Sequence, residues 1–375
     1  MEFSLMLHVI SCLGAMGLCQ LGVYRNNLVD ENKFRWNFEY LGSFLLLLLF
    51  IGFRVNLGRD WLNYLEIYDN INPDNAFSFS ESFELGFLFI VNTLKSVDAD
   101  FQYFIFITSL ITLLLFYESF RRCYYLLPLG IFVFFTGWAY PVAINTIRQG
   151  IAIFALMCAI SYIDDDEEWS GLKYMFFIVI GLLFHYTILL FIPCYYIAKV
   201  QIETKNLLII CASLYIVASF ILLPLFSDLL GLFSKYEEYS TDSYHSESIT
   251  FGLGATLLLV IRLIPLLVYD YIIKNWPSFT KYFVLYYLGL SVYYVFFRYL
   301  LITRITFYLQ FFELIVMSVF IYILFTSSKE YKMLGAGYIL LIVFNYVYTF
   351  GDFLRDQLIA NDYSLFFMNL TYMVN

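Results

Sequence analysis

Apolar residues follow one another along most of this chain, in windows of about twenty that short polar stretches separate. A helix that crosses a membrane needs roughly 20 consecutive apolar residues, because each backbone amide in the hydrocarbon must find its partner within the helix. The windows therefore predict an all-α polytopic membrane protein with about 10 full spans. They lie at 5–22, 39–53, 101–120, 123–140, 143–163, 206–227, 251–273, 280–297, 305–326 and 333–350.

The apolar window 172–198 is too long for one simple span, and Phe184-His185-Tyr186 interrupts it. We interpret this window as two half-spans that form a hairpin broken near His185. Short cytoplasmic loops are enriched in lysine and arginine. The hairpin places most of the basic residues on one side, whereas a single crossing would move every basic residue from Lys199 onward to the other side. The charge pattern therefore favours the hairpin.

The composition agrees with a membrane protein, since 62% of the 375 residues are hydrophobic and 14% are charged. Soluble domains are close to half apolar and one quarter charged. We expect residues 1–375 to form a single transmembrane domain with two outward loops, at about 54–100 and 229–250. The first loop contains a short apolar helix. The formal charge of −9 comes largely from acidic stretches at 164–168 and 237–247, so no nucleic-acid partner is expected.

Metal ligands and redox motifs do not stand out in the sequence. The six cysteines lie in or beside apolar windows without a C-x-x-C pair, and the three histidines are far apart. We therefore expect neither a metal ion nor a cofactor.

The basic residues outside the predicted cytoplasmic loops are mostly arginines, which bind phosphate or carboxylate through two parallel hydrogen bonds. Asn145, Arg148 and Gln149 are spaced i, i+3 and i+4, which predicts a polar stripe in the outer half of an apolar helix. An arginine within the membrane usually faces a cavity or a partner. No acidic residue lies within one helical turn of Arg148, so we expect its ligand to be an anion.

Arg298 and Arg304 flank a turn between two predicted spans, at the same outward level as Arg148. One interpretation is that both side chains reach up to lipid phosphates. The other is that the three arginines form one anion site.

The first outward loop begins with a glycine turn at Gly58, after which Asp60, Tyr64 and Tyr68 are spaced i, i+4 and i+8. They are therefore expected on one helix face. This face is either an interfacial helix anchored by tyrosines or, together with Arg59, a platform for a polyanion and sugars.

His185 and Glu84 are the two candidate bases outside that helix. A lone histidine in an apolar window is often a packing residue, but a helix break at membrane depth usually borders a cavity. Glu84 precedes the short apolar helix of the first outward loop, where an acid either caps the helix or acts as a base.

Five short motifs carry a resemblance to a known family, in the family's order and over most of the chain. They are Gly58-Arg59-Asp60 with Tyr64 and Tyr68, Glu84-Leu85-Gly86-Phe87, Asn145-Thr-Ile-Arg148-Gln149, Leu183-Phe184-His185-Tyr186-Thr187 and Arg304-Ile-Thr-Phe-Tyr308. The sequence resembles the EpsG family of membrane polysaccharide polymerases, which are related to the Wzy O-antigen and capsule polymerases.

The resemblance implies a glycosyltransferase-type enzyme of the bacterial cytoplasmic (inner) membrane. Such an enzyme joins undecaprenyl-pyrophosphate-linked oligosaccharide repeat units into O-antigen, capsule or exopolysaccharide at the outer face, and a chain-length regulator is a candidate partner. Arg148, Arg298 and Arg304, with Arg59, would bind the pyrophosphate. His185 is the first candidate for the base.

The remaining roles are less sharply defined by the resemblance. Asp60 and Glu84 are the next candidates for the base after His185. Tyr64 and Tyr68, with Asn145 and Gln149, are candidates for substrate binding.

Three other functions also need polar groups within a membrane. A flippase or transporter for lipid-linked sugars would use arginines as well, but such folds usually contain internal repeats, and none is visible. A membrane O-acyltransferase would use a lone histidine but would not need the arginines. An O-antigen ligase shares the donor with a polymerase and differs in the acceptor.

Overall fold

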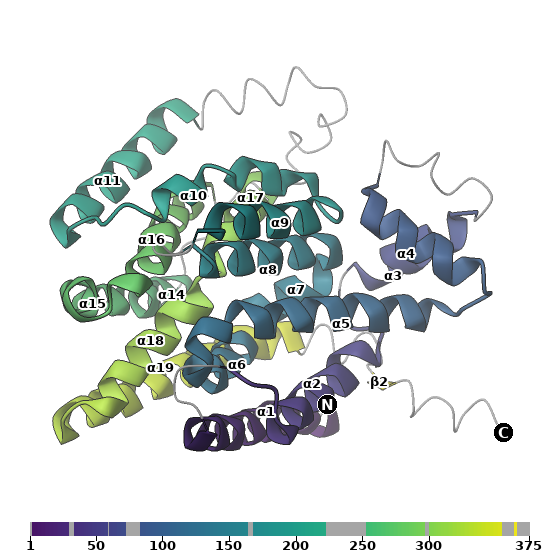
Figure 1. The fold of residues 1–375 in the computed structure, drawn as a ribbon, viewed down its shortest axis with the longest axis horizontal. Coiled ribbons are helices and arrows are strands. Elements are labelled where there is room, and N and C mark those ends of the chain that lie inside the picture. The colour runs from purple at the N-terminus through teal and green to yellow at the C-terminus, as the bar shows by residue number, and fades with distance from the viewer. Residues whose placement is uncertain are drawn as a thin grey trace. The chain divides into compact units, whose positions relative to one another are not determined.

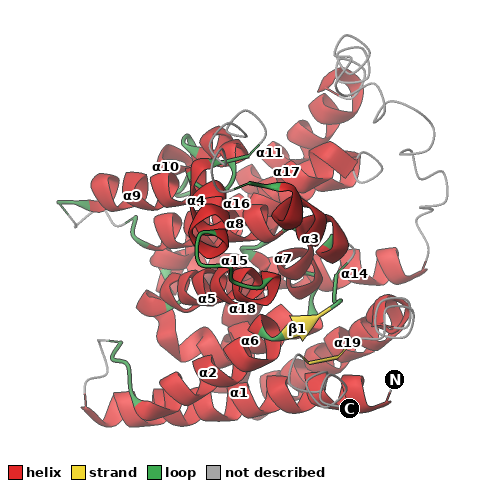
Figure 2. Cartoon of the chain, turned by 90° about the vertical axis from the view of Figure 1, so that its right-hand side faces the viewer, coloured by secondary structure: helices red, strands yellow, loops and turns green. Residues whose placement is uncertain are grey.

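The part of the chain that the structure describes is almost entirely helical (Figure 2), which confirms the predicted all-α class. The exception is a two-residue antiparallel pairing of β1 (Arg54–Val55) with β2 (Ser364–Leu365). The chain divides into two compact units, the first made of Met1–Tyr162, Leu172–Leu189 and Ile321–Asn375, the second of Ile163–Gly171 and Leu190–Phe320. The computed structural model describes residues 2–29, 34–58, 60–72, 83–163, 168–222, 253–296, 300–354 and 364–365.

Four helical stretches of this described part are long and apolar enough to cross a membrane. A fifth arises if the bent pair Arg121–Thr136 and Ala139–Asn145 counts as one span. Other apolar helices at predicted windows are shorter, among them α2 (Phe38–Gly52) and α8 (Ile147–Ser161), so the number of about 10 spans stays a prediction. The four stretches are Phe101–Ser119, Thr204–Ile221, Thr256–Asn275 and Thr303–Thr326.

The first unit is built around α8 (Ile147–Ser161), in which every residue from Gln149 to Ser161 is buried. A helix that is apolar on all sides belongs in a core. Along α8 lies α5 (Phe101–Ser119), α2 (Phe38–Gly52) packs on α5, and α1 (Glu2–Val29) runs beside α2 (Figure 1). The unit also contains η2 (Arg121–Leu126), α6 (Leu127–Thr136), α7 (Ala139–Asn145) and α19 (Lys329–Leu354).

Two predicted continuous helices of this unit are broken. The axis turns by 72° between α6 and α7, within the window 123–140. At Thr146 the backbone has φ −98° and ψ 63°, so α7 ends at Asn145 and α8 begins at Ile147. The prediction of one helix carrying Asn145, Arg148 and Gln149 is therefore wrong. The Thr146 hydroxyl donates to Val142 O at 2.9 Å, which offers the backbone an alternative to the helical ladder.

The first outward loop contains two short helices, α3 (Trp61–Asn70) and α4 (Leu85–Lys95), which lie near each other in Figure 1. The glycine turn that precedes α3 is required, because Gly58 has φ +111° and a Cβ atom there would lie 2.8 Å from Asn145 Oδ1. Asn145 Oδ1 also accepts from Asp60 N at 3.4 Å. The end of α7 and the start of α3 are thus joined.

Aromatic side chains attach α3 and α4 to α5. The Tyr64 ring lies 6.4 Å from that of Phe87 on α4 and 6.2 Å from that of Phe104 on α5, between ring centroids. Tyr68 contacts Phe101 and Phe104 at 5.6 and 6.1 Å. Both tyrosines are buried, whereas the sequence suggested an interfacial or substrate-binding face for them. This cluster fixes the orientation of α4 and of the residue that precedes it.

The predicted break near His185 is present. The helix α9 (Ser170–Leu182) ends three residues before His185, and the short helix η3 (Tyr186–Phe191) begins directly after it. His185 therefore stands between two helices, with its amide donating to Gly181 O of α9 at 2.8 Å and its carbonyl accepting from Ile188 N of η3 at 3.3 Å.

The second unit is organised around α16 (Thr280–Phe296), which contacts α10 (Cys194–Ile197), α11 (Thr204–Val217), α15 (Tyr269–Asn275) and α17 (Leu300–Gln310). Its other elements are η4 (Ala218–Leu222), α14 (Leu253–Leu263), η6 (Ile264–Val268), η7 (Pro277–Phe279) and most of α18 (Glu313–Thr326). Arg262 of α14 donates from Nε to Glu313 Oε2 of α18 at 3.1 Å, and both side chains are almost fully buried. Glu313 is thus the partner of Arg262. It lies 51 residues away along the chain, so helical spacing in the sequence could not identify it.

Candidate active site

Glu84 lies at the centre of the candidate site. Its Oε2 accepts from Arg148 Nη1 at 2.5 Å, and its Oε1 lies 3.0 Å from His185 Nδ1. The two partners are 64 and 101 residues away along the chain. All three residues belong to the first unit. The structure thus joins three predicted site residues that the sequence could only place separately.

A close backbone contact puts Glu84 beside the helix break. Glu84 is the residue before α4, and two positions later Gly86 N donates to Leu183 O at 2.7 Å. A Cβ atom on Gly86 would lie 2.6 Å from Leu183 O and 2.8 Å from Leu183 Cβ, both shorter than real contacts. Glycine therefore allows the first turn of α4 to touch the segment that carries His185.

Replacing Gly86 by alanine should separate these two segments. We expect Gly86→Ala to lower stability by about 1–3 kcal/mol, as insertion of a methyl group into a filled space does. The activity of the folded fraction should also fall, because Glu84 would move away from His185. Thermal unfolding in detergent and an activity assay would measure the two effects. Gly337→Ala is the matched control, since its added Cβ meets no atom within 4 Å, and equal behaviour of both variants would contradict the contact's importance.

Arg148 lies in the first turn of α8, where the positive end of the helix dipole disfavours a cation. The carboxylate of Glu84 compensates this charge. The guanidinium lies over the rings of Phe83 and Phe87, 5.1 and 5.4 Å from their centroids, and it hydrogen bonds to the Tyr64 hydroxyl. Its Nε is buried and has no hydrogen-bond partner among the described residues. The side chain is 24% exposed, so part of it remains open to a ligand.

Burial favours the neutral form of both acidic groups near Arg148, Glu84 and Tyr64, but it decides the direction of the pKa shift only for Tyr64. Burial alone would raise the pKa of Glu84, but the hydrogen bond with His185 and the charge of Arg148 outweigh it and hold the pKa below its ordinary value. Glu84 is therefore ionised at neutral pH. Burial raises the pKa of the Tyr64 phenol, which stays protonated.

The hydrogen bond of His185 determines which of its nitrogens can react. An ionised carboxylate only accepts, so Nδ1 carries the proton that faces Glu84. The other nitrogen, Nε2, then holds a lone pair in the neutral ring. The His185 side chain is 27% exposed, whereas that of Glu84 is 5% exposed. Of the two, His185 is thus the group that a ligand can reach, and its bond to Glu84 orients it.

Other predicted site residues of this unit have structural contacts. The Tyr68 hydroxyl donates to Ala99 O at 2.7 Å, and Lys95 Nζ donates to Tyr68 O at 3.0 Å. Asp60 precedes α3 and makes no side-chain capping bond there. Gln149 is buried next to Arg148 in α8. Of the two tyrosines Tyr64 and Tyr68, Tyr64 is the one that has a hydrogen bond to Arg148 among the described residues.

The described structure does not place the remaining predicted arginines relative to Glu84. Arg304 is half-buried on α17, in the second unit. Arg59, Arg298 and the outward loop at 229–250 lie outside the described residues. Their roles stay predictions.

The sequence analysis missed Arg54. This side chain is 2% exposed and donates to Ile51 O at 2.8 Å, Ser109 Oγ at 2.9 Å and Ile144 O at 3.3 Å. It therefore ties the end of α2 to α5 and α7. The polar residues Thr108, Ser109 and Thr112 interrupt an otherwise apolar window. They are the feature of the sequence that could have indicated a buried polar partner at this place.

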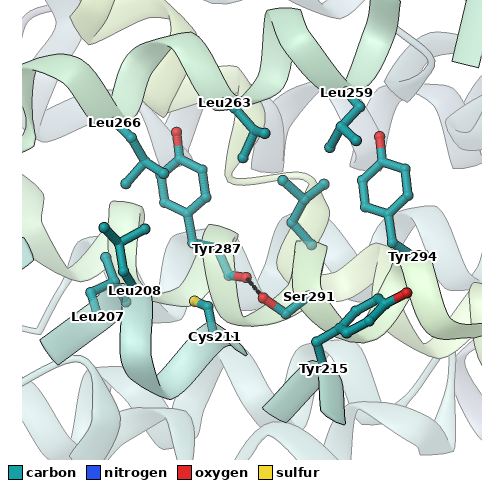
Figure 3. A pocket seen from close by; sticks show the side chains of 11 residues that line it. Leu207, Leu208, Cys211, Tyr215, Leu259, Leu263, Leu266, Tyr287, Ser291 and Tyr294 are labelled. Atoms are coloured by element: carbon teal, nitrogen blue, oxygen red, sulfur yellow. Dashed lines mark hydrogen bonds between the residues drawn. The ribbon is translucent and has the colours of Figure 1, made fainter. Parts of the chain in front are cut away.

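A separate pocket of about 350 Å³ lies within the second unit (Figure 3). Leucines from α11, α14 and η6 face Tyr287, Ser291 and Tyr294 of α16, and no charged side chain is among the described residues that line it. Tyr294 also has a hydrogen bond to Arg262, which is not among the residues that line the pocket. This pocket can surround an apolar group but offers no base. The described residues also contain no group of three His, Cys, Asp or Glu side chains that could hold a metal ion.

Residues 39–362 of the chain match the EpsG family. The chain belongs to the EpsG family. The match covers most of the sequence, including Glu84, Arg148 and His185, and it confirms the resemblance drawn from the motifs. An EpsG-family protein is a membrane polysaccharide polymerase, with a glycosyltransferase-like activity. No curated protein and no solved structure matches this sequence.

Proposed function

We propose that this EpsG-family protein joins undecaprenyl-pyrophosphate-linked oligosaccharide repeat units into O-antigen, capsule or exopolysaccharide. The reaction would take place at the outer face of the bacterial cytoplasmic membrane. The observation that carries the proposal is the cluster of Glu84, Arg148 and His185, which combines a cation suited to pyrophosphate with an oriented base.

The proposed reaction exchanges one bond at the anomeric carbon of the donor sugar. The bond from this carbon to the pyrophosphate oxygen breaks, and its electron pair leaves with the lipid pyrophosphate. A new bond forms to the hydroxyl oxygen of the acceptor repeat unit. The hydroxyl proton passes to His185 Nε2, and the resulting imidazolium is stabilised by Glu84 through Nδ1.

Arg148 would stabilise the departing pyrophosphate. Negative charge grows on the leaving oxygen in the transition state, and a guanidinium placed there lowers the barrier. Tyr64 holds this guanidinium and is a candidate to meet the first sugar. Arg59, Arg298 and Arg304 are proposed to bind the same anion, with Asn145 and Gln149 supporting the site.

The proposal is tested in a strain that lacks the gene, complemented with the wild type, His185→Ala or the control Glu66→Gln. Glu66 is exposed on α3 and faces away from the cluster. We expect His185→Ala to lower the rate of chain extension by about 10²–10⁴-fold, the contribution of a general base. Most chains should then stop at one repeat unit. Surface-polysaccharide length and membrane abundance of each variant are measured together.

Three results would reject this proposal. Long polysaccharide chains in the strain that lacks the gene would exclude polymerisation and would favour the O-acyltransferase. A lack of repeat units at the outer face would indicate a flippase. Long chains that are made but not attached to their acceptor would indicate a ligase.

A further inference from the structure

We propose that Glu84 releases Arg148 to the pyrophosphate of the donor and then interacts with His185 alone. Donor binding would thereby activate the base. This inference rests on the proposed function, because it requires a pyrophosphate donor at Arg148. It makes Glu84 a positioning residue that changes partners, in place of the alternative base that its sequence position suggests.

The geometry of Glu84 permits this exchange because its two partners use different oxygen atoms. Arg148 binds Oε2, while His185 binds Oε1 at 3.0 Å. Loss of the bond between Arg148 and Oε2 therefore leaves the bond between His185 and Oε1 in place. The backbone contact between Gly86 and Leu183 also holds Glu84 and the helix break together without help from Arg148.

A ligand can reach Arg148 more readily than it can reach Glu84. Its side chain is 24% exposed against 5% for Glu84, and its Nε has no hydrogen-bond partner among the described residues. A pyrophosphate carries more negative charge than a carboxylate and accepts two parallel bonds from a guanidinium. It can therefore compete with Glu84. The rings of Phe83 and Phe87 keep the guanidinium in position while its partner changes.

The exchange alters the charge that His185 experiences. Before the donor binds, Arg148 offsets the negative charge of Glu84, and Tyr64 beside them is neutral. After the exchange, the carboxylate of Glu84 interacts with His185 alone. Its full negative charge then stabilises the imidazolium that forms when the acceptor loses its proton. His185 thus becomes an effective base only when a donor is present. This order would limit transfer to stray hydroxyl groups.

The test compares the wild type with Glu84→Gln, an isosteric change that removes the competing charge. The probe is farnesyl pyrophosphate, titrated by calorimetry into the full-length protein in detergent at fixed ionic strength. We expect Glu84→Gln to bind the probe roughly fivefold more tightly or better, the lower end of ordinary coupling between sites. Its kcat for chain extension should nevertheless fall, because His185 loses its carboxylate. The control Glu66→Gln should match the wild type in both measurements.

The possible failures can be told apart. Equal or weaker binding of the probe by folded Glu84→Gln, with normal binding by the wild type, would overturn the exchange and leave the donor assignment standing. No binding by the wild type would overturn the donor assignment and the exchange with it. An unchanged kcat in Glu84→Gln would show that Glu84 does not position His185, which also overturns the inference. Thermal unfolding of each variant confirms that folded protein is compared.

Discussion

Replacing Arg148 by lysine should lower the rate of polymerisation by roughly 10²–10³-fold, the usual loss when one preorganised donor to a developing negative charge is removed. Lysine keeps the charge but not the planar group that lies over Phe83 and Phe87 while bonded to Glu84 and Tyr64. An ammonium on that stem can offer only a point charge. The rate is measured with purified protein and a lipid-linked repeat unit, as product length against time.

A matched arginine is available in the same unit. Arg121 pairs with Glu118 at 2.9 Å, one turn away on the chain, and its side chain is 46% exposed. We expect Arg121→Lys to retain most of the activity. If Arg148→Lys polymerises as fast as Arg121→Lys while both are folded, Arg148 supplies only charge, and its assignment to the pyrophosphate is wrong.

The second large effect concerns the buried pair in the other unit. Glu313→Leu should lower the free energy of unfolding by about 3–5 kcal/mol, because it leaves the charge of Arg262 buried without its carboxylate. Glu313 also lies 3.4 Å from the Tyr286 hydroxyl, which loses its acceptor. The double variant Arg262→Leu/Glu313→Leu removes both charges and should recover most of this loss. Thermal or denaturant unfolding in detergent provides the measurement.

Glu330→Leu controls for the chemistry of this substitution, since Glu330 is exposed at the start of α19. It should change the free energy of unfolding by no more than about 0.5 kcal/mol. A double variant that is as unstable as Glu313→Leu would show that packing, and not the unpaired charge, causes the loss.

Local patterns were sufficient for the helices and for the break at His185. Apolar windows predict where helices lie, and an interruption of such a window predicts where one ends, because both depend on neighbouring residues. The short helix after Glu84 followed from the same argument. The bends at Gly137 and Thr146 could not be predicted in this way. Apolar residues continue across both positions, and hydropathy contains no information about the direction of a helix axis.

The partner of Arg148 could not be found in this way. Spacing along a helix reveals only residues within one turn, and no acid lies there, so the sequence predicts an anionic ligand for Arg148 and not a glutamate of the chain. The structure supplies Glu84 from 64 residues away, through the fold of α3 and α4 on α5. Arg262 and Glu313 illustrate the same limit over 51 residues. Contacts between distant segments require the packing itself, which one sequence does not specify residue by residue.

The pair of Arg262 and Glu313 also has a consequence for synthesis on the ribosome. The chain grows at about 5–20 residues per second, so Glu313 follows Arg262 into the membrane after roughly 3–10 s. An arginine within a membrane helix costs up to about 2.5–3.5 kcal/mol on insertion scales when no partner is present. We therefore expect α14 to settle in the bilayer only after α18 arrives. Truncation between these helices should leave an early segment that the quality-control proteases of the cell recognise.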